Sequence, residues 1–175
     1  MRGEMLIRPM IAHDLPEVAR LQDIGYAPSL RDSAEALRSR IDLAGHFCWI
    51  AVMDDVLIGY ILAHPWPSGT PPVPDTILTQ PDRDGLVHYI HDLSVDPRSR
   101  AGGIGRALVR ASQVAALASG LTHSELVAID GAGPYWRWQG YDDMPIDAAL
   151  ARKLRSYGGS ARYLGRDLRA VDGQE

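Results

Sequence analysis

The chain has 175 residues, 46% hydrophobic and 23% charged, a composition typical of one globular domain with a sizeable core. Its net charge of −4 and its mixture of 18 basic and 22 acidic residues argue against a nucleic-acid-binding surface. No apolar run approaches the ~20 residues of a membrane helix, and early polar residues interrupt any signal-peptide core. With Cys48 as the single cysteine, a disulfide within the chain and a cysteine-based metal site are both excluded. We therefore expect a cytoplasmic protein that binds no metal, no nucleic acid and no membrane.

The first third of the chain alternates between the patterns of strands and helices. Apolar residues at three- and four-residue spacing predict two amphipathic helices, over 14–25 and 33–43. Short apolar stretches predict strands at 5–10, 47–53 and 56–63. The dipeptide Asp54–Asp55 predicts a tight hairpin turn between the last two strands.

A proline-rich segment follows the third strand. Five prolines between residues 65 and 74 disfavour a regular strand or helix, so we expect the strand to end at Ala63. The segment 65–85 is then a loop insertion of about twenty residues, which is either a pocket wall and lid or a disordered insert. Trp66 lies three residues past the expected end of the strand, close to the sheet. We therefore predict that it forms an apolar wall of a substrate pocket.

The centre of the chain combines a strand, a glycine-rich bend and a helix. The strand spans about 88–95 and ends at Pro97, which has no backbone N–H for a sheet ladder. The helix spans 104–118, with apolar residues on one face. Free N–H groups at a helix start, together with nearby cations, favour anions such as phosphates. The glycines and arginines that predict a diphosphate site here are Gly102, Gly103, Gly105, Arg98, Arg100 and Arg106.

The last third of the chain continues the alternation. A strand is expected at 123–129, a loop with a short helix at 131–141, a helix at 147–155 and a closing strand at 160–168.

Two segments together resemble one known family. Residues 100–105, Arg-Ala-Gly-Gly-Ile-Gly, follow Leu-Ser-Val-Asp-Pro and fit the pattern R-x-x-G-x-G. Residues 135–141, Tyr-Trp-Arg-Trp-Gln-Gly-Tyr, resemble an F-Y-x-x-x-G-F helix end. Both are similar to signatures of the GNAT N-acetyltransferase superfamily. The resemblance implies a single α/β (α+β) domain over residues 1–175, with a mixed, mostly antiparallel central sheet flanked by helices.

The resemblance also implies acetyl-CoA as cosubstrate. Backbone groups of Leu93 and Val95 would pair with its pantetheine arm, and the glycine-rich bend would hold its diphosphate. The implied binding residues are Leu93, Ser94, Val95, Arg100, Ala101, Gly102, Gly103, Ile104, Gly105 and Arg106.

The catalytic residues match the superfamily less well. The tyrosine that often protonates the departing thiolate in the superfamily aligns with Trp136. An indole N–H is too weak an acid for this role. We therefore expect Trp136 to form a pocket wall and Tyr135 to be an alternative acid. The glutamate base of the superfamily falls at Tyr89. His91 is the leading candidate for the base, because imidazole titrates near neutral pH. Strand alternation places His91 and Asp92 on opposite faces, which leaves Asp92 a structural role.

Four functions remain open at this stage. The first is transfer of an acetyl group from acetyl-CoA to the amine of a small molecule by direct attack. The second is acetylation of protein N-termini or lysines, which needs an open groove. The third is a non-catalytic acyl-CoA-binding domain, suggested by Trp136 at the acid position. The fourth is a nucleotide-binding domain, which Leu108 disfavours because a G-x-G-x-x-G motif needs a small residue there. A homodimer also remains open.

Overall fold

A seven-stranded sheet forms the centre of the structure, a computed structural model that describes residues 3–82 and 84–173. Its strand order is β1-β2-β3-β4-β5-β7-β6. All neighbouring strands are antiparallel except β4 and β5, which are parallel. The strands are β1 (Met5–Pro9), β2 (Trp49–Met53), β3 (Val56–Pro67), β4 (Leu86–Val95), β5 (His123–Ala128), β6 (Asp142–Asp143) and β7 (Arg162–Asp167). The predicted fold class is confirmed.

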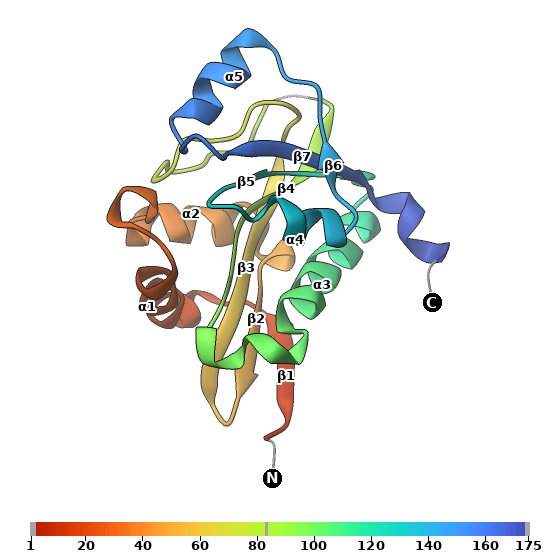
Figure 1. Cartoon of the computed structure of the whole chain (residues 1–175). Helices are drawn as coiled ribbons and strands as arrows, with labels where there is room; N and C mark the ends of the chain where they lie inside the picture. The colour runs from red at the N-terminus through yellow and green to blue at the C-terminus, as the bar shows by residue number, and fades with distance from the viewer. Residues whose placement is uncertain (1–2, 83, 174–175) are drawn as a thin grey trace.

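Helices cover both faces of this sheet (Figure 1). One core contains residues from α1, α2 and the strand faces beneath them, and a second contains residues from α3, α4 and the opposite faces. The α-helices are α1 (Leu15–Gly25), α2 (Ala34–Ala44), α3 (Ile104–Ala118), α4 (Gly133–Trp138) and α5 (Ala148–Arg155). Short 3-10 segments are η1 (Ala12–Asp14), η2 (Pro28–Leu30), η3 (Gly45–Phe47), η4 (Pro97–Gly102) and η5 (Leu168–Gly173). No helix among the described residues is long and apolar enough to cross a membrane.

Strand β3 extends further than the sequence suggested. It continues through Pro65 and Pro67, which pair with His88 and Leu86 of β4. The prediction that the strand ends at Ala63 was therefore wrong, and the loop begins at residue 68. The physical reason is that β2 pairs with β3 only as far as Ile61, so the far end of β3 has one free side. Prolines spaced two apart direct their missing N–H groups to the same side of the strand, where no ladder bond is lost.

Two irregularities in β4 create the space for a site. The register between β3 and β4 passes from Leu62–Asp92 to Ala63–Ile90, so His91 is an extra, bulged residue. Strand β4 pairs with β5 only over residues 88–90, and the rest of β4 diverges from its parallel neighbour. A bulge reverses the alternation of side chains beyond it. The prediction that His91 and Asp92 lie on opposite faces was therefore wrong, and both border the same cavities.

Candidate active site

The larger of two adjoining cavities is a cleft of about 750 Å³ between the diverging strands, α3 and α4. Most residues predicted to bind the cosubstrate line it, namely Leu93, Ser94, Val95, Arg100, Gly103, Ile104, Gly105 and Arg106. Gly102 lies in η4 and does not line the cleft. Ala101 lies in the same segment, and its side chain is outside the described part of the chain.

The start of α3 faces the cleft without a side-chain cap. Gly103 occupies the N-cap position at φ +68°, a left-handed conformation, and a Cβ there would meet open space. The first N–H groups of the helix are therefore free to bind an anion. Arg100 and Arg106 line the cleft beside them. Arg98 was expected beside them but does not line the cleft. Its guanidinium binds the Asp96 carboxylate at 2.9 Å instead.

The backbone of β4 offers hydrogen-bonding groups to the cleft. The Asp96 N–H donates to the Ile58 carbonyl of β3. Because backbone groups alternate in direction along a strand, the N–H and C=O groups of Leu93 and Val95 point away from β3. In agreement, the Leu93 carbonyl accepts a 3.4 Å hydrogen bond from Tyr26, and the Val95 carbonyl accepts one from Arg100. The unpaired edge can therefore bind an extended ligand as an added strand would.

Helix α4 forms the opposite wall of the cleft. Trp136 is buried and packs edge-on against Tyr141, while Tyr135 is partly exposed. The Tyr135 hydroxyl accepts a 2.9 Å hydrogen bond from Gln139 and touches the first turn of α3, where a Cβ on Gly105 would lie only 2.5 Å away. Burial raises the pKa of Tyr135 above its usual value, so its hydroxyl stays protonated at neutral pH. Arg106 stacks over the exposed Trp138 ring.

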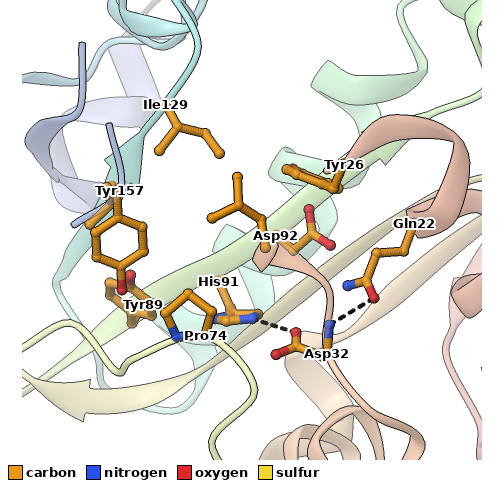
Figure 2. A pocket seen from close by; sticks show the side chains of 11 residues that line it. Gln22, Tyr26, Asp32, Pro74, Tyr89, His91, Asp92, Ile129 and Tyr157 are labelled. Carbon is orange, nitrogen blue, oxygen red and sulfur yellow. Dashed lines mark hydrogen bonds and ion pairs between the residues drawn. The ribbon is translucent and has the colours of Figure 1, made fainter. Parts of the chain in front are cut away.

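A second cavity of about 70 Å³ adjoins the cleft at the bulge of β4 (Figure 2). The two cavities share Tyr26, His91, Asp92, Val127 and Ile129. The smaller one is otherwise lined by Gln22, Leu30, Asp32, Pro74, Tyr89 and Tyr157. Tyr89 therefore borders the small cavity and not the cleft. Burial raises its pKa well above the ordinary value, so this phenol is neutral.

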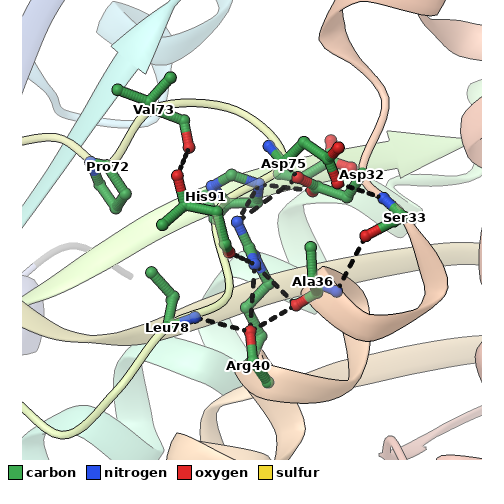
Figure 3. A network of polar contacts seen from close by, with 12 residues as sticks. Asp32, Ser33, Ala36, Arg40, Pro72, Val73, Asp75, Leu78 and His91 are labelled. Carbon is green, nitrogen blue, oxygen red and sulfur yellow. Dashed lines mark hydrogen bonds and ion pairs between the residues drawn. The ribbon is translucent and has the colours of Figure 1, made fainter.

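His91 belongs to a buried network of charges (Figure 3). Its Nε2 lies 2.7 Å from Asp32 Oδ2 and 3.2 Å from an Arg40 nitrogen. Burial raises the pKa of Asp32, but the hydrogen bond from His91 and the nearby positive charges outweigh it and lower that pKa to about 2. Asp32 is therefore ionised, and it favours the tautomer with hydrogen on Nε2. Nδ1 of His91 has no hydrogen-bond partner among the described residues.

Asp92 lies beside His91 in a different environment. The Tyr60 hydroxyl donates to Oδ2 of Asp92, whereas Oδ1 is buried and has no partner among the described residues. Burial raises the pKa of Asp92, although the nearby hydroxyls of Tyr26 and Tyr60 partly oppose the rise. An unpaired buried carboxylate oxygen is unfavourable in a folded protein, so a ligand that supplies a donor would be stabilised here.

The proline-rich loop encloses the small cavity from two sides. The Asp75 N–H donates to Asp32 Oδ1 at 2.7 Å, and the Leu78 N–H donates to Ser39 of α2 at 3.0 Å. On the other side, the Tyr157 hydroxyl donates to the Pro72 carbonyl at 2.6 Å. The loop is thus tied both to α2 and to the segment after α5. It forms a pocket wall, one of the two alternatives left by the sequence.

Trp66 contributes to the loop more than to the cavities. Its Nε1 donates to the Thr70 carbonyl at 2.7 Å, and its ring packs edge-on against the buried His64. Trp66 is not among the residues that line either cavity, whereas Trp136 lines the cleft.

Comparisons with known proteins agree with this geometry. The acetyltransferase (GNAT) family matches residues 15–141, which is more than half of the chain. The chain belongs to this GNAT family. Among curated proteins, no sequence match was found.

Several solved structures share the fold of this GNAT acetyltransferase at low sequence identity. The NatC complex bound to Gag peptide and CoA aligns with a TM-score of 0.72 and 17% identity, over 94% of this chain and 98% of that one. N-acetylglutamate synthase from Neisseria gonorrhoeae, with CoA and N-acetyl-glutamate, aligns with a TM-score of 0.69 and 19% identity, over 96% and 36%. The GphF GNAT-like decarboxylase with isobutyryl-CoA aligns with a TM-score of 0.67 and 20% identity, over 94% and 100%.

The cleft of this GNAT protein suits acetyl-CoA by its own chemistry. It combines an uncapped helix start, an open glycine at its N-cap and two arginines at one end, and an unpaired strand edge along its length. These groups match a diphosphate and an amide-containing arm. Among the described residues, no group of three or more His, Cys, Asp or Glu side chains could hold a metal ion.

The polar residues of the small cavity that the sequence analysis missed include Tyr26, Asp32 and Tyr157. Tyr26 and Asp32 lie in the irregular segment between α1 and α2, and Tyr157 follows α5. No local motif marks them, because they approach β4 only through the tertiary fold. Asp92 was considered on the right strand, but the bulge that turns it towards the cavity had no visible signal.

Proposed function

We propose that the protein transfers the acetyl group of acetyl-CoA to a primary amine of a small molecule by direct attack. The observation that carries this proposal is the small cavity at the bulge of β4, enclosed by the loop and continuous with the cleft. A cavity of about 70 Å³ has room for a few non-hydrogen atoms. Such a space suits the amine end of a compact molecule better than a polypeptide.

The enclosing loop also argues against a protein substrate. A peptide needs an open groove along the sheet, but the loop is joined to Asp32 on one side of the small cavity and to Tyr157 on the other. Acetylation of protein N-termini or lysines would require both hydrogen bonds to break. This reading remains the alternative, since the NatC complex shares the fold and carries a peptide.

In the proposed mechanism, His91 removes a proton from the amine. An alkylammonium has a pKa near ~10 and must lose a proton before it can act as a nucleophile. With Nε2 hydrogen-bonded to Asp32, Nδ1 of His91 is left as the proton acceptor. Asp32 then stabilises the imidazolium that forms, as a carboxylate does in a catalytic triad. Acetyl-CoA supplies the thioester that the amine attacks.

The remaining site residues have proposed supporting roles. Backbone groups of Leu93 and Val95 bind the pantetheine arm, and the start of α3 binds the diphosphate with Arg100 and Arg106. Tyr135 stays the candidate for protonating the thiolate, because the indole of Trp136 is too weak an acid to do so. Trp136 serves as an apolar wall. We propose that Trp66 holds the loop against the sheet, and that Tyr89 shapes the small cavity.

Thiol release from acetyl-CoA, measured against small amines, amino acids, aminoglycosides and peptides, tests this function. Release with small amines and not with peptides supports it. Release with peptides alone would establish the alternative. Tight CoA binding without turnover on any acceptor would indicate a non-catalytic acyl-CoA-binding domain, the reading suggested by Trp136.

A further inference from the structure

The charges of the two adjoining cavities are separated along the site. The cations, Arg100 and Arg106, lie at the start of α3. The carboxylates lie at the other end, where Asp32 and Asp92 line the small cavity and Asp130 lines the cleft after β5. No Lys or Arg is among the residues that line the small cavity in the described part of the chain. An anionic group on the acceptor would therefore have no Lys or Arg to neutralise its charge there.

The guanidinium of Arg40 has both terminal nitrogens bonded within the protein, while its Nε is buried without a partner among the described residues. It is fully buried and lines neither cavity. Its NH1 donates to the carbonyls of Ala36 and Thr76 at 2.6 and 2.8 Å, and its NH2 lies 3.5 Å from Asp32. To bind a carboxylate of the acceptor through NH1 or NH2, Arg40 would have to break its hydrogen bond to the loop carbonyl of Thr76 or its ion pair with Asp32. We infer that Arg40 serves the protein and not the ligand.

Asp92 offers the complementary feature, a carboxyl group whose Oδ1 has no hydrogen-bond partner among the described residues. Its Oδ1 is buried without a hydrogen bond, while the carboxylate borders both cavities at the point where they meet (Figure 2). A primary ammonium brings one positive charge and three N–H donors. It would satisfy Oδ1 and neutralise the local excess of negative charge. His91, the proposed proton acceptor, is the neighbouring residue and lines the same two cavities.

We propose that the acceptor is a small primary amine without a carboxylate beside its amino group, and that its ammonium is held by Asp92. In an α-amino acid the carboxylate is two bonds from the amine nitrogen. It would enter the same small space as Asp92 and Asp32, where like charges repel and water is excluded. This inference rests on the proposed acetyl transfer to a small molecule, and it separates amines from the amino acids they resemble.

Matched pairs of amines and amino acids provide the test. Isobutylamine and valine, isopentylamine and leucine, and phenethylamine and phenylalanine differ only by the carboxylate, and each molecule has a single amine. Thiol release from acetyl-CoA should give a kcat/KM at least a hundredfold higher for the amine than for the amino acid in every pair that reacts. Equal or better turnover of the amino acids would overturn the inference while leaving acetyl transfer to small molecules intact.

Binding measurements keep the inference testable if none of these acceptors is turned over. Calorimetry on the CoA-saturated protein should show tighter binding of the amines than of the amino acids. In Asp92→Asn the amines should bind at least tenfold more weakly, with the affinity for CoA unchanged. Asp42→Asn, which alters an exposed carboxylate of α2, should leave amine binding unaffected. Amine binding that is the same in Asp92→Asn and in the native protein would refute the role of Asp92.

Discussion

The two ends of the site are built in opposite ways. The end proposed for CoA is cationic and uses mainly backbone groups, from the edge of β4 to the uncapped start of α3. The end proposed for the acceptor is acidic and uses side chains. Oδ1 of Asp92 has no partner among the described residues, and Asp32 is buried beside His91 and Arg40. Backbone groups do not change with the sequence, so they suit a ligand that many proteins bind. Side chains differ between sequences and can therefore select a particular substrate. We therefore expect the small cavity to set the specificity for the acceptor.

The two ends also differ in how the chain assembles them. The groups proposed to hold the arm and the diphosphate of CoA lie within residues 93–106, one continuous strand, bend and helix, while α4 forms the opposite wall of the cleft. The acceptor end combines the segment between α1 and α2, the loop after β3, the bulge of β4, the end of β5 and the segment after α5. Variants in the first should alter CoA affinity alone. Variants in the second should alter turnover or stability and leave CoA affinity unchanged.

The largest effect is expected when the proposed base is removed. His91→Ala should lower kcat/KM by about 10²–10⁴ and leave CoA affinity within about twofold of the native value. Any pH dependence of kcat/KM that arises from proton transfer to His91 in the native enzyme should be absent from the variant. Thiol-release kinetics across pH and calorimetry with CoA measure both. Native turnover with an unaltered pH profile would show that His91 has only a structural role.

The buried network should make Asp32 important for stability. In Asp32→Asn, Arg40 loses its carboxylate partner, and breaking a buried ion pair destabilises a protein by about 3–5 kcal/mol. The Asp32 carboxyl titrates near ~4 in an unfolded chain and at about 2 in the fold. Its stabilising contribution is therefore complete above pH ~4 and is lost as the pH falls through about 2. Denaturant unfolding of both proteins should show a difference that shrinks over this range.

An exposed pair on α2, the helix that contains Arg40, provides the control for Asp32. Arg38 and Asp42 of α2 form an ion pair with both side chains more than half exposed. Because water screens it, Asp42→Asn should change the free energy of unfolding by less than about 0.5 kcal/mol at any of these pH values. Equal destabilisation by the two variants would contradict the buried network.

A smaller effect, confined to CoA binding, is expected at the start of α3. Gly103→Asp places a carboxylate where the diphosphate is proposed to lie, so CoA affinity should fall by about 2 kcal/mol, roughly thirtyfold. Gly103→Asn has the same shape without the charge and should weaken binding less. Calorimetry with CoA measures both. A folded Gly103→Asp protein with native CoA affinity would refute the diphosphate site.

The smallest effect separates two arginines that the sequence grouped together. Arg100 lines the cleft and is exposed, so Arg100→Ala should weaken CoA binding about fivefold. Arg98 is bound to Asp96 outside the cleft, so Arg98→Ala should leave CoA affinity unchanged. CoA titrations at two salt concentrations should show a stronger salt dependence for the native protein than for Arg100→Ala. Similar losses for both variants would contradict the geometry.

The sequence by itself determined most of the fold and the proposed CoA end. Apolar periodicity located α2, α3 and the central strands within a few residues, because side-chain burial on one face repeats with the local backbone geometry. The glycine-rich bend could be recognised because helix starts bind anions through groups close together in the chain. The glycine-rich bend is visible in the sequence because every residue that forms it lies within one short segment.

Only the tertiary structure decided the acceptor end. The bulge that brings His91 and Asp92 to the same cavities depends on the pairing of β4 with β3, which no local pattern records. Pro65 and Pro67 remain in a strand because β2 stops short of them, a property of the neighbouring strand. Asp32 reaches His91 from 59 residues away. Contacts over such separations follow from how the chain packs, so the chemistry of the small cavity appears only in the folded protein.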